Sequence, residues 1–139
     1  MDKEIWDLLI NKAKEVLNAR VVSPFIECGQ VAAALLTKDG NIYTGVCIDS
    51  ACSLGICAER NAIQNMITNN ESKIDKLVCI DSNGNVDYPC GACRELIMQL
   101  DKDSKNIKFL INTKTYEYVT MEELVPNWWG YSRFEDNKE

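Results

Sequence analysis

The sequence predicts an α/β fold in three layers, in which helices cover both faces of a central mixed sheet of five strands. Three observations support this prediction. Five short apolar runs have the length and the flanking turn residues of strands. Longer segments between these runs carry apolar residues at helical spacing. The 139 residues, 46% of them hydrophobic, suffice for one core and are few for two, so we expect a single domain over residues 1–139.

The first half of the chain predicts a helix and then a hairpin. Residues 2–17 form an amphipathic helix, because apolar residues recur three and four positions apart from Ile5 to Leu17. Residues 21–30 contain Pro24 and Gly29, and we interpret them as irregular. Residues 31–37 are an apolar run suited to a buried strand. Residues 41–48 return as a second strand after turn residues at 38–40, so these two strands are expected to pair.

The second half alternates helices with strands. Small residues at 49–55 predict a loop, and a helix is expected over residues 56–68. A short strand at 76–81 and a turn region at 82–89 lead to a helix over residues 90–100. The last two strands are expected at 107–112 and 116–120. A helical turn at 121–124 and an aromatic tail follow, and the tail contains Trp128, Trp129, Tyr131 and Phe134.

The charge of the chain argues against two classes of partner. The net charge is -6 and no basic stripe is present, whereas proteins that bind nucleic acid neutralise phosphates with Lys and Arg. No apolar run approaches the roughly 18 residues of a membrane span, and the first residues lack a basic region followed by an apolar one. We therefore expect no nucleic-acid partner, no membrane partner and a cytoplasmic location.

The cysteine and histidine counts limit the chemistry. Seven cysteines are an odd number, and a cytoplasmic chain keeps its thiols reduced, so metal or catalytic use is favoured over disulfides. The chain has no histidine, which excludes Ser–His and Cys–His nucleophilic pairs. Any bound metal must therefore be held by sulfur or oxygen.

Two cysteine motifs stand where loops are expected to enter helices. Cys57 begins the segment C-A-E, and Cys90 and Cys93 belong to the segment P-C-G-A-C-R. The partial positive charge of a helix N-terminus lowers thiol pKa values and stabilises thiolates as zinc ligands. The C-x-x-C spacing lets both sulfurs reach one ion at about 2.3 Å, and Cys57 would be the third protein ligand. A fourth position is then open for water, as in catalytic zinc sites.

Charged residues beside these cysteines have the chemistry to assist such a site. Glu59 lies two residues after Cys57 and can face the metal without binding it, so we expect it to move protons. Arg60 and Arg94 each follow closely on a ligand. We expect them to donate hydrogen bonds to sulfur and so offset the negative charge of three thiolates.

Other interpretations of the C-x-x-C spacing stay open. Alone, it fits a redox pair, half of a structural zinc site or chance. The C-A-E segment favours catalytic zinc, because structural sites usually have four protein ligands and the other cysteines are poorly placed for a fourth. We expect those four as small buried thiols, and they are Cys28, Cys47, Cys52 and Cys79.

With these motifs the sequence resembles the small cytidine deaminase family, in particular its all-cysteine zinc type, which includes homotetrameric cytidine deaminases and blasticidin S deaminases. The likeness covers nearly the whole chain and extends to residues 31–36, 54–56 and 124–126. The resemblance implies a five-stranded sheet between helices and one zinc ion per subunit. It also implies water attack at the pyrimidine carbon that bears the amine, and a homotetramer with active sites at subunit contacts.

The resemblance further implies substrate contacts. The backbone near Ala58 would contact the base, and Trp129 would stack on the base in a neighbouring subunit, with ordinary interface packing as an equal alternative. Family members usually carry an Asn and a Glu at the end of the second strand to hold the ribose, but this chain has Cys47 and Asp49 there. A thiol is a weak hydrogen-bond partner. The aromatic residue common before the first long strand is also missing, with Gly29 near its position.

These observations predict a hydrolase that converts cytidine or deoxycytidine to uridine or deoxyuridine plus ammonia, in pyrimidine salvage. An alternative keeps the chemistry but uses a modified cytosine nucleoside of the blasticidin S type, whose positive groups would meet Glu27 and Asp49. A non-catalytic zinc-binding module is disfavoured, because a structural site has no use for Glu59. A deaminase of polynucleotides is disfavoured by the acidic charge.

Overall fold

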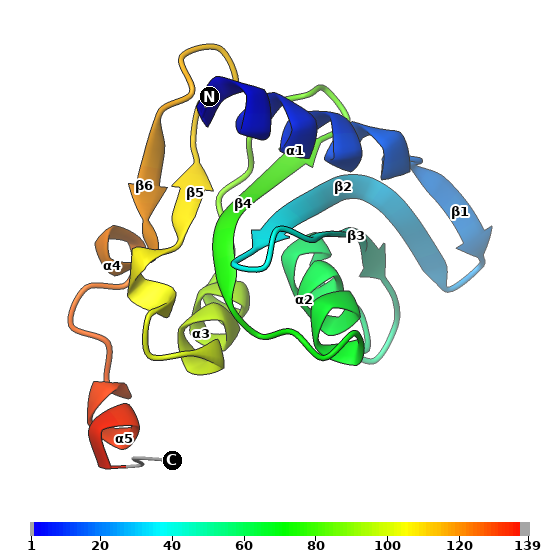
Figure 1. Cartoon of the computed structure of the whole chain (residues 1–139). Coiled ribbons are helices and arrows are strands. Elements are labelled where there is room, and N and C mark those ends of the chain that lie inside the picture. Colours follow the sequence, from blue (N-terminus) through cyan, green and yellow to red (C-terminus); the bar gives the residue numbers. More distant parts are fainter. Residues whose placement is uncertain (1, 137–139) are drawn as a thin grey trace.

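One mixed sheet runs through the computed structural model, which describes residues 2–136 of the chain. Helices cover both faces of this sheet (Figure 1), so the predicted three-layer architecture is confirmed. The pairing order is β3-β2-β4-β5-β6, and β4 and β5 run parallel while the other neighbours are antiparallel. The strands are β1 (Arg20–Ser23), β2 (Ile26–Thr37), β3 (Ile42–Asp49), β4 (Ile74–Asp81), β5 (Lys108–Leu110) and β6 (Tyr118–Thr120).

The prediction that residues 21–30 are irregular is wrong, because they include most of β1 and the start of β2. Together with the first third of β2, β1 forms a hairpin, which was missed because Pro24 and Gly29 are usually breakers of regular structure. Pro24 lies in the two-residue turn, where no ladder hydrogen bond is required. Gly29 has a φ of +82° within a bulge of β2, and a Cβ there would lie 2.1 Å from the Asn18 carbonyl oxygen.

Successive side chains of the central strands point to opposite faces of the sheet, so the core has two layers. Ala32 and Ala34 of β2 face helix α1 (Asp2–Val16), and the side chains of Trp6 and Leu9 on this helix are buried against them. The intervening residues, such as Ala33 and Leu35, face the opposite layer of helices. Small side chains on β2 let helices approach the sheet closely on both faces.

Two helices of that opposite layer carry the cysteine motifs. They are α2 (Ala58–Thr68) and α3 (Gly91–Leu100), close to the predicted ranges. Helix α2 lies directly against the backbone of β3, because a Cβ on Gly45 would come within 2.4 Å of the Ala62 amide nitrogen. The remaining helical segments are the 3-10 turn η1 (Ser104–Asn106), α4 (Met121–Leu124) and α5 (Tyr131–Asp136). None of the helices within residues 2–136 is long and apolar enough to cross a membrane.

Candidate active site

The N-termini of α2 and α3 bring three cysteine sulfurs together. The Sγ atoms of Cys57, Cys90 and Cys93 all lie within 4.8 Å of one another. The Cys57 and Cys90 sulfurs are 3.3 Å apart, and those of Cys90 and Cys93 are 3.4 Å apart. Cys57 and Cys90 occupy the N-cap positions of their helices, so their thiols lie beside the unpaired N–H groups of the first helical turns.

This cluster fits a zinc ion. Tetrahedral zinc with sulfur ligands at about 2.3 Å places those sulfurs about 3.8 Å apart, so the observed separations need only a small widening. Three thiolates suit zinc chemically, and no fourth His, Cys, Asp or Glu joins the cluster within the described part of the chain. Three protein ligands beside a cavity are the arrangement of a catalytic zinc site.

Hydrogen bonding favours the thiolate at one of these residues. Partial burial opposes ionisation of Cys90, but its backbone hydrogen bonds from Cys93 and Ala92, together with the neighbouring thiols, lower the pKa of Cys90 below its ordinary value. Burial, and then the charge of Glu59, raises the pKa of Cys93. Hydrogen bonding thus favours the thiolate at Cys90, whereas burial opposes it at Cys93.

Glu59 lies in the first turn of α2 and lines the same cavity as Cys57 and Cys90. Only 4% of its surface is exposed, and this burial raises the pKa of Glu59 above its ordinary value. The nearby charge of Asp87 acts in the same direction, while a hydrogen bond with the Cys79 thiol opposes it. A carboxyl group with a raised pKa is suited to accept and return protons near neutral pH.

The two arginines have different partners. The Arg60 Nη2 atom donates to the Cys57 sulfur over 3.5 Å, and hydrogen bonds to Cys57 and Cys93 raise the pKa of its guanidinium further. The expectation that Arg94 donates a hydrogen bond to a ligand sulfur is wrong. The Arg94 Nε donates to the Pro89 carbonyl oxygen over 2.8 Å, and its Nη1 donates to the Leu124 carbonyl oxygen over 3.1 Å. Arg94 thus fastens the loop before Cys90 to the end of α4.

The cavity beside the cysteines has a volume of about 450 Å³, within the range of small-molecule sites. Three of the expected substrate contacts line it, namely Cys47, Asp49 and Ala58. The Cys47 thiol donates to the Gln30 side-chain oxygen over 3.2 Å. Three further lining residues were not indicated by the sequence pattern, and they are Cys79, Asp87 and Tyr88.

Trp129 lies outside this cavity. It is 62% exposed, its indole nitrogen donates to Glu95 over 3.0 Å, and the Arg133 guanidinium lies 5.5 Å from its ring centre. Two of the four thiols expected to be buried are not, because Cys47 is half-buried and Cys52 is exposed. Cys52 belongs to the loop before Cys57, where its φ is +61°.

Comparison with known proteins identifies the family. The model of the cytidine and deoxycytidylate deaminase zinc-binding region matches residues 9–110, which is most of the chain. The chain belongs to this deaminase family. The resemblance, the fold class and the enzyme class predicted from the motifs are thereby confirmed.

Individual members of the deaminase family show the extent of the likeness. A cytidine deaminase of Sporosarcina psychrophila is 38% identical over 99 residues, which cover 69% of this chain and 71% of that protein. A blasticidin-S deaminase of Bacillus cereus is 33% identical over 105 residues, covering 69% and 74%. The crystal structure of cytidine deaminase from Mycobacterium leprae superimposes with a TM-score of 0.72 at 28% identity, covering 88% of this chain and 98% of that one.

Proposed function

We propose that this protein catalyses the zinc-dependent hydrolytic deamination of cytidine or deoxycytidine, giving uridine or deoxyuridine and ammonia, in pyrimidine salvage. One observation carries the proposal: three cysteine sulfurs lie within 4.8 Å of one another, and two of these cysteines, Cys57 and Cys90, line a cavity that buried Glu59 also lines. Membership of the deaminase family and the likeness to a cytidine deaminase over 69% of the chain support it.

The proposed mechanism assigns the metal to Cys57, Cys90 and Cys93, with one zinc ion per chain. Zinc bound there would lower the pKa of a water molecule, an effect that the charge of three thiolates weakens. Glu59 takes a proton from the attacking water and delivers it to the ring nitrogen beside the amine-bearing carbon. Glu59 then passes the second water proton to the amine, which leaves as ammonia while the carbon–oxygen bond of the product is completed. Arg60 offsets the charge of the thiolates throughout.

Substrate recognition is proposed to involve the end of β3 and the start of α2. The backbone at Ala58 would contact the base, and Cys47 and Asp49 would face the sugar, because all three residues line the cavity beside Glu59. The Asp49 carboxylate offers hydrogen-bond acceptors to the ribose hydroxyls, whereas the Cys47 thiol is only a weak hydrogen-bond partner. This composition favours substrates that bring hydrogen-bond donors to the sugar end of the cavity.

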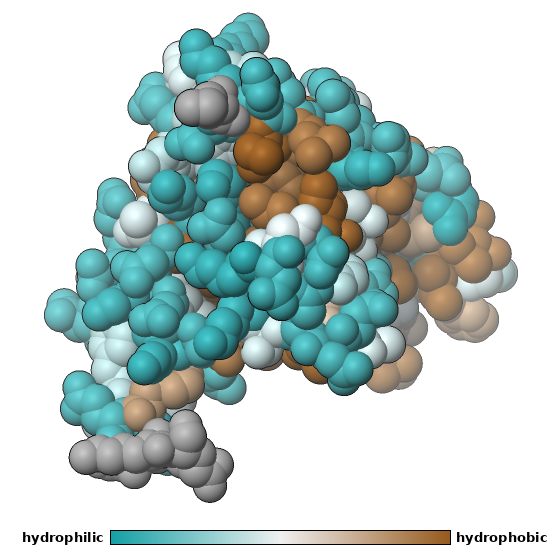
Figure 2. Space-filling view, in the orientation of Figure 1, coloured by the Kyte–Doolittle hydropathy of each residue, from teal (hydrophilic) through white to brown (hydrophobic). Residues whose placement is uncertain are grey.

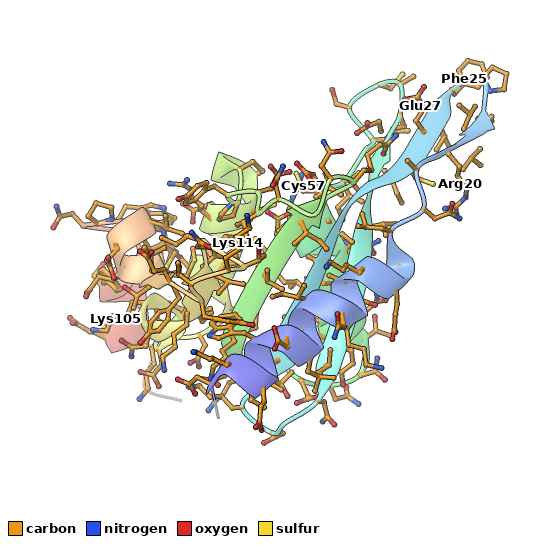
Figure 3. All side chains as sticks on the ribbon, turned by 90° about the horizontal axis from the view of Figure 1, so that it is seen from above. Arg20, Phe25, Glu27, Cys57, Lys105 and Lys114 are labelled. Atoms are coloured by element: carbon orange, nitrogen blue, oxygen red, sulfur yellow. The ribbon has the colours of Figure 1, made fainter. Side chains whose placement is uncertain are left out.

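A second candidate function is deamination of a cytosine nucleoside that carries a positively charged group. Glu27 and Asp49 are directly opposed on β2 and β3, where two like charges are unfavourable without a cation between them. Both residues also line a second cavity of about 450 Å³, which shares Asp49 and Ser50 with the first. The likeness to a blasticidin-S deaminase supports this candidate. Figure 3 shows Glu27 on the hairpin that projects beyond Cys57.

A panel of nucleosides tests both functions. Cytidine, deoxycytidine and blasticidin S are incubated with the zinc-loaded protein, and the loss of the 4-amino group is followed by absorbance and by ammonia release. Conversion of cytidine or deoxycytidine at the buffer rate would rule out the leading proposal. If blasticidin S is the preferred substrate, Asp49→Asn should lower kcat/KM for it far more than for cytidine.

We also propose that one domain per chain assembles into a homotetramer, with Trp129 reaching the site of a neighbouring subunit. Large apolar side chains are exposed around the cavities, including Leu54 at 79% and Phe25 at 73%. Figure 2 shows the hydrophobic surface at the β1 end of the molecule, where Val21 and Val22 are exposed. The hydrogen bond to Glu95 and the contact with Arg133 hold Trp129 in one orientation.

Mixed oligomers test the placement of Trp129. Sedimentation gives the oligomeric state of the unsubstituted chain, of Trp129→Ala and of Glu59→Gln. If Trp129 acts in a neighbouring site, refolding the two variants together restores part of the activity that each lacks alone. A Trp129→Ala chain that dissociates into monomers would instead assign Trp129 to interface packing.

A further inference from the structure

Tyr88 contributes an aromatic side chain to the wall of the candidate active site. Among the described residues that line this cavity, it is the only aromatic one. It stands two positions before Cys90, so its ring enters the cavity from the same loop that carries a zinc ligand. Tyr88 is 55% exposed, which leaves a large part of the side chain free to contact a ligand.

The surroundings of Tyr88 hold its ring in place. The ring lies nearly parallel to that of Phe109, with 19° between the planes and 6.5 Å between the centroids. Phe109 is fully buried in β5, so it is a fixed support for one side of the Tyr88 ring.

The backbone on either side of Tyr88 is also fixed. The Asp87 amide donates to the Cys79 carbonyl oxygen over 2.9 Å, which ties the preceding residue to β4. The Pro89 carbonyl oxygen accepts from Arg94 over 2.8 Å, and the proline ring restricts its own φ. A side chain held in this way loses little conformational entropy when a ligand binds.

We propose that Tyr88 is a substrate-binding residue whose ring packs against the pyrimidine base. The inference rests on the proposed function. A pyrimidine has flat faces that stack well on aromatic rings, whereas the other side chains of this cavity are aliphatic, small or polar. A base whose reacting carbon lies near Glu59 and Cys90 is within the same cavity as Tyr88. The chain thus provides an aromatic wall from its own subunit, independently of Trp129.

Two substitutions of Tyr88 distinguish the contribution of the aromatic ring from those of its apolar bulk and its hydroxyl group. Tyr88→Phe keeps the ring, and Tyr88→Leu keeps apolar bulk without an aromatic face. Tyr118→Leu is the matched control, because Tyr118 is a partly exposed tyrosine on β6 that does not line the cavity. Each zinc-loaded variant is analysed for zinc content, for uridine binding by calorimetry and for kcat and KM with cytidine.

Tyr88→Leu is expected to weaken uridine binding about tenfold or more and to raise KM for cytidine, with full zinc content and kcat within about twofold. Tyr88→Phe and Tyr118→Leu should bind uridine within about twofold of the unsubstituted protein. Unchanged uridine binding by Tyr88→Leu would overturn the proposal, as would an equal loss in Tyr88→Phe or a loss that follows zinc content. Any of these three results would leave the proposed function intact. If the unsubstituted protein neither binds uridine nor deaminates any nucleoside tested, the proposed function is overturned as well.

Discussion

The Arg60 guanidinium donates a hydrogen bond to the Cys57 sulfur over 3.5 Å, between residues three positions apart at the start of α2. Three thiolates and a divalent ion carry a net charge of -1, and hydrogen bonds to sulfur disperse that charge. Since Arg94 donates to backbone carbonyls instead, Arg60 is the arginine of the two motifs that contacts a ligand sulfur.

Replacing Arg60 should weaken metal binding. We expect Arg60→Gln to lower zinc affinity or turnover about 10- to 100-fold, because the Cys57 thiolate loses its charged donor. Competition with a chromophoric chelator measures the affinity. Arg20→Gln is the control, since Arg20 donates to the Asn18 carbonyl oxygen at the surface and, among the described residues, to no ligand sulfur. Equal zinc affinity and equal rates for Arg60→Gln and the unsubstituted protein would contradict this role.

Replacing Glu59 should separate metal binding from catalysis. We expect Glu59→Gln to keep its zinc and to lose about 10²- to 10⁴-fold in kcat, because the amide occupies the same buried position but cannot carry the proton. Metal analysis and rates with cytidine provide the two readouts. Glu122→Gln, at an exposed position on α4, should change neither. Retention of activity in Glu59→Gln would exclude the proposed proton path.

The contact between β3 and α2 should be sensitive to one methyl group. Gly45→Ala would bring a Cβ within 2.4 Å of the Ala62 nitrogen and 2.8 Å of the Ala58 carbonyl oxygen. Helix α2 must then shift, and with it Cys57 and Glu59, so we expect a loss of about 1–3 kcal/mol in unfolding free energy and reduced activity. Urea denaturation measures the loss. Gly91→Ala is the stability control, because, apart from its chain neighbours and the backbone of its own helix, no heavy atom of the described residues lies within 4 Å of the added Cβ.

The pH dependence of stability should include a contribution from Glu71. The Tyr43 hydroxyl donates to this carboxylate over 2.6 Å and lowers the pKa of Glu71 below its ordinary value. A carboxylate with a lowered folded-state pKa contributes stability above the unfolded-state pKa of about 4.3, and this contribution is lost as the pH falls through the folded-state value.

Substitution of Glu71 should therefore reduce the acid sensitivity of folding. We expect Glu71→Gln to lower the unfolding free energy at neutral pH but to leave it nearly unchanged below the folded-state pKa. Urea unfolding at a series of pH values measures the difference. Tyr43→Phe removes the main donor and should act in the same direction. Parallel pH curves for Glu71→Gln and the unsubstituted protein would show that the hydrogen bond contributes nothing.

Sequence patterns predicted those features that depend on neighbours along the chain. The helices that follow Cys57 and Cys90 begin within about two residues of the expected positions, because periodicity and helix-start chemistry are local. The β1–β2 hairpin was missed, since Pro24 and Gly29 break most strands and only their positions in a turn and a bulge make them compatible.

Features that depend on contacts between distant parts of the chain could not be predicted from local sequence patterns. The orientation of Arg94 is set by the Leu124 carbonyl, thirty residues further along the chain. Asp87 and Tyr88 are positioned by contacts with Cys79 of β4 and Phe109 of β5, which no local pattern reveals. A tyrosine before a C-x-x-C motif has no periodic signal of its own.

The positions of the cysteines have a consequence for how the chain folds. Cys57 and Cys90 are 33 residues apart, and β4 lies between them. An ion held by both closes a loop of that length, and a cross-link of this size removes unfolded-chain entropy worth about 4 kcal/mol. The metal would therefore stabilise the tertiary structure as well as take part in catalysis. Folding of the newly made chain would then be thermodynamically coupled to binding of the ion.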